Sequence, residues 1–121
     1  MLVTILWYSI KSIKAEGNEL TAQVTTDASS PWFAGHFPGD PILPGIAQLK
    51  MVADLITGSR EEDLQVTGLS RIKFRKIVRP GELLDIHATP CDKNHQYAFR
   101  ISDNSVEICS GMMFFAPKVM K

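Results

Sequence analysis

The chain has 121 residues, 45% of them hydrophobic, which suits one domain with a single core, and we expect that domain to span residues 1–121. Thirteen Lys and Arg balance thirteen Asp and Glu, so no overall charge would attract nucleic acid or an anionic membrane. No apolar run approaches the length of a membrane span, and Cys91 and Cys109 form neither a CxxC pair nor a dense disulfide framework. These features favour a reducing compartment, by default the cytoplasm.

The first part of the chain predicts two strands, at residues 2–12 and 19–26. In the second of them apolar and polar residues alternate through LTAQV, the period of a half-buried strand. Gly17 and Asn18 between the two strands suit a tight turn. The apolar start lacks a basic beginning and a small-residue cleavage site, so it favours a strand over a signal peptide.

Residues 29–45 hold four prolines and three glycines, so neither the helical nor the strand period can continue there, and we expect an ordered loop. Pro44 then suits the first turn of a helix of about four turns that Gly58 ends. Apolar residues fill this helix almost all round, which predicts burial on most sides. Its polar residues Lys50, Asp54 and Thr57 share one stripe because they stand at i, i+4 and i+7.

The remainder predicts four strands, at 64–78, 83–89, 96–102 and 105–115, separated by polar or Pro-Gly turns. Two strands, a buried helix and four further strands indicate an α+β fold, an antiparallel sheet wrapped around one central helix. Such a sheet leaves an edge and a face to cover. We therefore expect a dimer.

Three segments resemble the bacterial 3-hydroxyacyl-acyl-carrier-protein dehydratases: GHFPGDPILPG with the helix after it, RIKFRKIVRPGELLDIHA, and GMMFFA. They cover most of the chain from Phe33 to Ala116 in the family's order. The resemblance implies a hot-dog fold and a hydro-lyase that removes water from 3-hydroxyacyl thioesters in fatty-acid or related lipid and polyketide biosynthesis, without a cofactor or a metal. It also implies an acyl carrier protein, which carries the acyl group on phosphopantetheine, as partner.

By the same resemblance His36 is the base that removes the C2 proton, and the backbone N–H of Gly45 stabilises the thioester oxygen as it gains charge. A histidine exchanges protons near neutrality, and the start of a helix offers free N–H groups and a positive dipole end. We expect further residues to contact the acyl group, although core packing is the simplest account of those in the helix. They are Phe37, Pro44, Ile46, Leu49 and Ala53.

The chain departs from the family at Lys50, because the dehydratases have a glutamate or aspartate at this position, fourteen residues after the motif histidine. An ammonium group donates a proton at neutral pH only where burial lowers its pKa. Three interpretations stay open: Asp54 acts as the acid, Lys50 supplies an electrostatic donor, or the two form a structural ion pair in an inactive site. Asp40 is a poorer candidate for the acid.

Five cations fall within residues 71–79, a strip that could dock an acidic carrier protein or form the solvated face of a strand. They are Arg71, Lys73, Arg75, Lys76 and Arg79. His87 and His95 are not spaced for a metal site. The leading hypothesis is a dehydratase that forms a homodimer or a higher oligomer. A catalytically silent acyl-thioester binder, or a subunit of a heterodimeric dehydratase, is the alternative, and a hot-dog thioesterase is a third.

Overall fold

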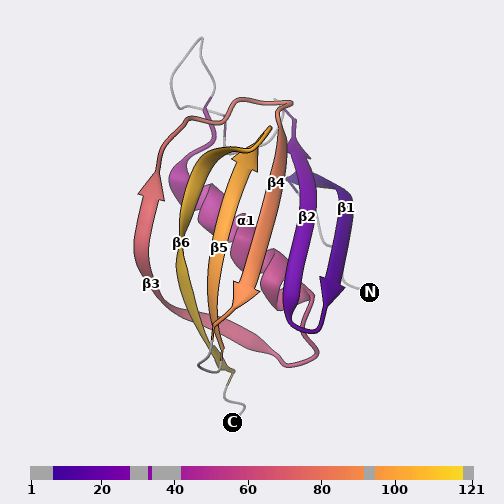
Figure 1. The fold of residues 1–121 in the computed structure, drawn as a ribbon, viewed down its shortest axis with the longest axis vertical. Coiled ribbons are helices and arrows are strands. Elements are labelled where there is room, and N and C mark those ends of the chain that lie inside the picture. The colour runs from indigo at the N-terminus through magenta and orange to yellow at the C-terminus, as the bar shows by residue number, and fades with distance from the viewer. Residues whose placement is uncertain (1–6, 28–32, 34–41, 92–94, 119–121) are drawn as a thin grey trace.

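The computed structural model describes residues 7–27, 33, 42–91 and 95–118. In chain order the elements of this part are β1 (Tyr8–Glu16), β2 (Glu19–Thr26), α1 (Gly45–Gly58), β3 (Leu64–Phe74), β4 (Leu83–Pro90), β5 (Gln96–Asp103) and β6 (Val106–Pro117). The strands form one six-stranded sheet in the order β1-β2-β4-β5-β6-β3, in which all neighbours are antiparallel (Figure 1). The predicted antiparallel sheet with one helix is confirmed.

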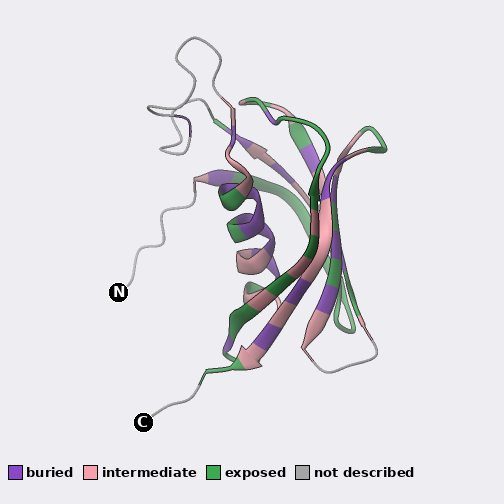
Figure 2. Cartoon of the chain, turned by 90° about the vertical axis from the view of Figure 1, so that its left-hand side faces the viewer, coloured by how far each residue is buried: buried purple, intermediate pink, exposed green. Residues whose placement is uncertain are grey.

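The sheet curls around α1, which lies in its hollow (Figure 2). Strands β2, β4 and β5 bury every second residue, since alternate side chains of a strand point to opposite faces. The helix adds its own buried side chains to the same core, which Figure 2 shows as the purple side of the helix turned toward the sheet. Those side chains are Ala47, Gln48, Leu49, Met51, Val52, Leu55 and Ile56.

One side of α1 has no strand over it, and the stripe of exposed residues runs along that side (Figure 2). The prediction that the helix is buried on most sides therefore holds only for the side that faces the sheet, while Ile46, at 63% exposure, and Lys50 are exposed on the other side. None of the described helices is long and apolar enough to cross a bilayer.

Two predicted strands end at other residues than the sequence suggested. Strand β1 covers residues 8–16 instead of 2–12, of which 2–6 lie outside the described residues. After Tyr8 every residue of this edge strand is exposed, so no alternation in hydrophobicity marks it. Strand β3 ends at Phe74 instead of residue 78, and farther along the chain the carbonyl of Val78 accepts a hydrogen bond from the N–H of Leu43 (2.8 Å), ahead of the helix.

Strands β1 and β3 are the two edges of the sheet (Figure 1). Strand β3 carries a bulge between Ser70 and Lys73, where Arg71 adopts a left-handed φ of 56°. A bulge offsets the alternation of side chains, and Phe74 is 51% exposed instead of lying in the core opposite the cations. The edge next to the helix start therefore carries an aromatic ring on its surface.

Candidate active site

The motif histidine and the phenylalanine after it, His36 and Phe37, lie outside the described residues. The structure does describe the residues that join this loop to the helix. Leu43 is buried, and its N–H donates to the carbonyl of Val78, beyond the end of β3. The start of α1 is thereby attached to the edge of the sheet.

Pro44 immediately precedes the helix as its N-cap, with φ −60° and ψ 151°, so the helix begins at Gly45. The Pro44 carbonyl accepts hydrogen bonds from the N–H groups of Ala47 (3.1 Å) and Gln48 (3.2 Å). No side chain caps the helix, and its first turn holds no acidic residue. Within the described part of the chain no partner is recorded for the N–H of Gly45 or of Ile46, as is usual for the first residues of a helix. Two open donors at the positive end of the helix dipole can stabilise an oxygen that gains negative charge.

Lys50 and Asp54 lie on the uncovered side of the helix and form an ion pair with 3.6 Å between Nζ and Oδ1. Both side chains are exposed in the single chain, at 56% and 41%. The third member of the predicted stripe, Thr57, donates from its hydroxyl to the Asp54 carbonyl (3.2 Å). Lys50 thus lacks the burial that would make an ammonium a useful acid, while the carboxylate of Asp54 is engaged by a cation.

Asp54 also borders a hollow of about 530 Å³ between the helix and the edge strand β1, which Tyr8 and Ile13 line from the strand. Burial, and secondarily the charge of Asp54, raise the pKa of Tyr8 to about 12. The tyrosine therefore stays protonated at neutral pH, as a neutral group beside the only carboxylate of the helix.

The residues expected to contact the acyl group occupy different depths. Ile46 is largely exposed beside Gly45, and Pro44 is half-buried. Leu49 lies in the core, and Ala53 packs against it. Of these four residues, Pro44 and Ile46 are the ones that present apolar surface next to the open N–H groups in the single chain.

All five cations of the strip are exposed, but they do not form one free positive surface. Arg75 forms an ion pair with Glu107, and its hydrogen bond to that carboxylate lowers the pKa of Glu107. Lys76 lies 3.9 Å from Asp103. Two of the five charges are therefore compensated by residues of β5 and β6.

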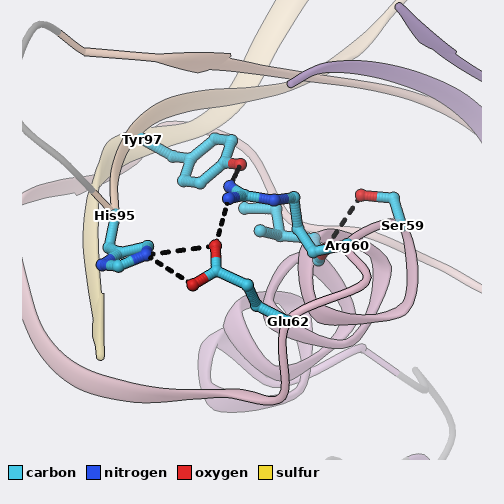
Figure 3. Close-up of polar contacts among 6 residues, drawn as sticks. Ser59, Arg60, Glu62, His95 and Tyr97 are labelled. Atoms are coloured by element: carbon cyan, nitrogen blue, oxygen red, sulfur yellow. Dashed lines mark hydrogen bonds and ion pairs between the residues drawn. The ribbon is translucent and has the colours of Figure 1, made fainter. Parts of the chain in front are cut away.

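Sequence reasoning missed a polar network beyond the other end of the helix (Figure 3). Arg60 donates to the hydroxyl of the buried Tyr97 and to Glu62 (2.7 Å), whose carboxylate also contacts His95 at 3.2 Å. Arg60 and Glu62 lie in the loop after the helix, His95 lies in the turn before β5 and Tyr97 lies in β5, more than thirty positions along the chain, so no local pattern could have revealed the network. The network joins the loop after α1 to the sheet. Among the described residues no three His, Cys, Asp or Glu side chains are grouped to hold a metal ion.

A second residue that sequence reasoning missed is Phe74. A Cβ built on Gly45 would lie 2.6 Å from Cζ of the Phe74 ring, so the edge of the ring rests directly on the first residue of the helix. The only available signal was its place in the segment RIKFRKIVRPG.

Residues 12–112 match the family model described as ApeI-like, ApeI dehydratase. The chain belongs to this family.

Two relatives carry the name 3-hydroxyacyl-[acyl-carrier-protein] dehydratase FabZ. The protein of Chlamydia pneumoniae is 32% identical over 88 residues, which cover 65% of this chain and 58% of the relative. That of Caldicellulosiruptor saccharolyticus is 32% identical over 116 residues, which cover 85% of this chain and 81% of the relative. The predicted resemblance to this dehydratase family is confirmed, although the chain spans only 58% of the length of the Chlamydia protein.

A solved structure titled "The Dehydratase Heterocomplex ApeI:P from Xenorhabdus doucetiae" superimposes with a TM-score of 0.81 at 24% identity, over 89% of this chain and 96% of the other. This similarity confirms the predicted hot-dog fold.

Proposed function

We propose that this chain is a 3-hydroxyacyl-thioester dehydratase, acting on acyl groups carried by an acyl carrier protein in the cytoplasm. The observation that carries the proposal is the uncapped start of α1, where Gly45 and Ile46 have N–H groups without a recorded partner among the described residues. The family match and the FabZ relatives support the same reaction. The phosphopantetheine-linked substrate would place its carbonyl oxygen at these donors.

In the proposed reaction His36 takes the proton from C2 while the C3–O bond breaks, a double bond forms between C2 and C3, and the hydroxyl leaves as water with a proton from an acid. The donors at Gly45 stabilise the negative charge that the thioester oxygen gains. Asp54 is the better candidate for the acid, since it is a carboxyl group and borders the hollow beside Tyr8. Lys50, its ion-pair partner, would hold that carboxyl in place or interact with the substrate oxygen.

We propose further that two copies associate along β3. This edge strand exposes Val66 and Leu69 as well as Phe74, and Ile46 stands exposed at the helix start that Phe74 contacts. Exposed apolar side chains along an unpaired edge favour pairing with a second chain. Leu69→Lys should shift sedimentation from dimer to monomer, and an unchanged dimer would contradict this arrangement.

The decisive experiment is hydration of a short 2-enoyl thioester, or dehydration of its 3-hydroxy partner, by the purified wild-type chain beside His36→Ala. Activity in the wild type that His36→Ala loses, by a factor of about 10² or more, is the expected result for removal of the base. Activity that survives in His36→Ala would contradict the assigned base. Hydrolysis of the thioester to a free acid would instead indicate a hot-dog thioesterase.

A second candidate function is a silent acyl-thioester binder, or one subunit of a heterodimeric dehydratase. The Lys50–Asp54 ion pair favours it, because Lys50 occupies the family's acid position and a partner subunit would then supply a carboxylate. The similar structure from Xenorhabdus doucetiae is itself titled a dehydratase heterocomplex. An inactive wild-type chain that gains activity only when mixed with a related hot-dog subunit would establish this function.

A further inference from the structure

Phe74 stands at the junction between the edge of the sheet and the start of the helix. Its backbone is held by the sheet, since Phe74 pairs with Cys109 of β6 and the N–H of the next residue, Arg75, donates to the carbonyl of Ile108 at 2.7 Å. The ring therefore projects from a fixed base. The opposite side of the contact is fixed as well, by the Leu43–Val78 hydrogen bond ahead of the helix.

A side chain at residue 45 would have to displace the ring of Phe74 from the position it holds in the structure. A Cβ there would lie 2.6 Å from Cζ, 2.9 Å from Cε1 and 3.1 Å from Cε2 of the ring, all closer than ordinary contacts. Gly45 has no positive φ, so the backbone conformation does not require a glycine at this position. The ring of Phe74 is what requires it.

The ring also shapes the surroundings of the open donors. With Phe74 on one side and Ile46 next in the chain, the N–H of Gly45 lies among apolar groups that are themselves half or more exposed. Hydrogen-bond donors aimed at a developing charge act most strongly where water is displaced by apolar surface. A ring resting on the helix start can therefore both fix the donor and exclude water from beside it.

We propose that Phe74 is a positioning residue for the dehydration, whose ring sets the place of the Gly45 N–H relative to the thioester oxygen. This inference rests on the proposed function. It adds a residue of the edge strand to a reaction otherwise carried by the loop and the helix. A displacement of about 1 Å of such a group can reduce the rate by about 10²-fold.

The test is a double-mutant cycle of Gly45→Ala and Phe74→Leu, with steady-state kinetics on a short 2-enoyl thioester and thermal unfolding for each variant. Leucine keeps the edge apolar but lacks the ring carbons that touch Gly45. We expect Phe74→Leu to lower kcat by about tenfold or more with little change in KM, as for an interaction made in the transition state. Val106→Ala, which trims a side chain of similar exposure (54%) at the first residue of β6, should leave both constants unchanged.

The unfolding measurements test the contact without reference to activity. Alanine is a better helix residue than glycine, so Gly45→Ala should raise the unfolding temperature in the Phe74→Leu background. In the wild-type background the same substitution should lower it, because the new methyl group meets the ring. An equal effect of Gly45→Ala in both backgrounds would overturn the inference.

The kinetic results separate the two proposals. If the wild-type chain is active and Phe74→Leu keeps its kcat, the inference about Phe74 is wrong and the proposed function stands. If the wild-type chain processes neither the 2-enoyl nor the 3-hydroxyacyl thioester, the proposed function fails and the positioning role fails with it. Sedimentation must first show that Phe74→Leu has the same association state as the wild type. If Phe74→Leu dissociates, Phe74→Met takes its place in the double-mutant cycle.

Discussion

The two ends of the helix differ in how their backbone groups are satisfied. At its C-terminal end the N–H of Ser59 donates to the carbonyls of Leu55 and Ile56, and the Ser59 hydroxyl donates to Ile56 again (2.9 Å). Beyond it the network of Arg60, Glu62, His95 and Tyr97 joins the next loop to the sheet (Figure 3). At the N-terminal end no side chain caps the helix, and an aromatic ring rests on its first residue.

The C-terminal end of the helix therefore contributes to stability, and the N-terminal end is left for the proposed function. Polar groups with partners at the C-terminal end stabilise the fold, because an unpaired buried polar group costs about 1–3 kcal/mol. Open donors at the N-terminal end contribute nothing of this kind to the folded chain. In the proposed function these donors bind the substrate. Substitutions at the N-terminal end should therefore change kcat, and substitutions at the C-terminal end should change the free energy of unfolding.

The largest effect is expected from Lys50→Glu, which restores a carboxyl group at the family's acid position near the open end. General acid catalysis typically contributes about 10²–10⁴-fold, so kcat for hydration of a 2-enoyl thioester should rise by about 10²-fold over the wild type if Asp54 does not already act as the acid, and should stay near the wild-type value if it does. The unfolding temperature should fall slightly, since the new carboxylate stands one turn from Asp54 in place of its cation.

Lys50→Gln is the matched control for this substitution, because it removes the ammonium without adding an acid. We expect Lys50→Gln to show no gain in kcat over the wild type, because an amide supplies no general acid. A folded Lys50→Glu protein without any gain in activity would contradict the interpretation that the wild-type chain lacks an acid at residue 50 that it needs.

The next largest effect is expected at the C-terminal end of the helix, from Arg60→Met. The substitution leaves the hydroxyl of Tyr97, a residue only 1% exposed, without its arginine donor and frees Glu62 from one of its two partners. The free energy of unfolding, measured by urea denaturation, should fall by about 1–3 kcal/mol, with kcat unchanged. Glu61→Gln, at an exposed neighbour, should change neither quantity. A loss of kcat in folded Arg60→Met would contradict the separation between the two ends.

Most of the fold could be predicted from the sequence, because it is encoded in local patterns. Alternation in LTAQV, the apolar helix that Gly58 ends and the turn at Gly17 and Asn18 all appear in the structure as predicted. Strand β1 was misplaced because it is an exposed edge whose pairing with β2, and not its hydrophobicity, makes it a strand.

The candidate site was only partly predictable. The helix start and the Lys50–Asp54 pair follow from spacing along one helix, and both appear as expected. The contact of Phe74 with Gly45 could not be predicted, because it depends on the bulge at Arg71 and on where β3 leaves the sheet. The network around Arg60 likewise joins residues that only the folded chain brings together.

A smaller effect is expected in the reactivity of the two cysteines. Cys91 reports on the surroundings of Arg60, and Cys109 reports on the core. Cys91 is half-buried beside a hollow of about 340 Å³ that Arg60 and His95 also line. Burial, and secondarily the charge of Glu107, raise the pKa of the Cys109 thiol to about 12, and the thiolate is the reactive form.

Iodoacetamide at pH 8 should therefore modify Cys91 in the native protein and Cys109 only after denaturation, as peptide mass spectrometry can establish. In Arg60→Met labelling of Cys91 should be several times faster, because removal of the guanidinium opens the hollow. Equal labelling of both cysteines in the native wild type would contradict the burial of Cys109, and an unchanged rate at Cys91 would show that Arg60 does not close the hollow.

The smallest effect is expected at the ion pair of Arg75 and Glu107, from Glu107→Gln. The hydrogen bond from Arg75, aided by Ser110, lowers the pKa of Glu107 below the ordinary glutamate value of about 4.3. A lowered pKa in the folded state means that the contribution to stability is complete above that ordinary value and is lost as the pH falls through the folded value. The wild type should thus unfold at a slightly higher temperature than Glu107→Gln at pH 7, and the difference should vanish in acid.

Glu61→Gln again serves as the control, and it should show no such convergence. The pair of Arg75 and Glu107 is exposed to solvent, which screens it, whereas Arg60 binds the hydroxyl of a buried tyrosine. The loss from Glu107→Gln at pH 7 should therefore be clearly smaller than the loss from Arg60→Met. Equal losses would contradict the expectation that the exposed pair of Arg75 and Glu107 stabilises the fold less than the hydrogen bond of Arg60 to the buried Tyr97.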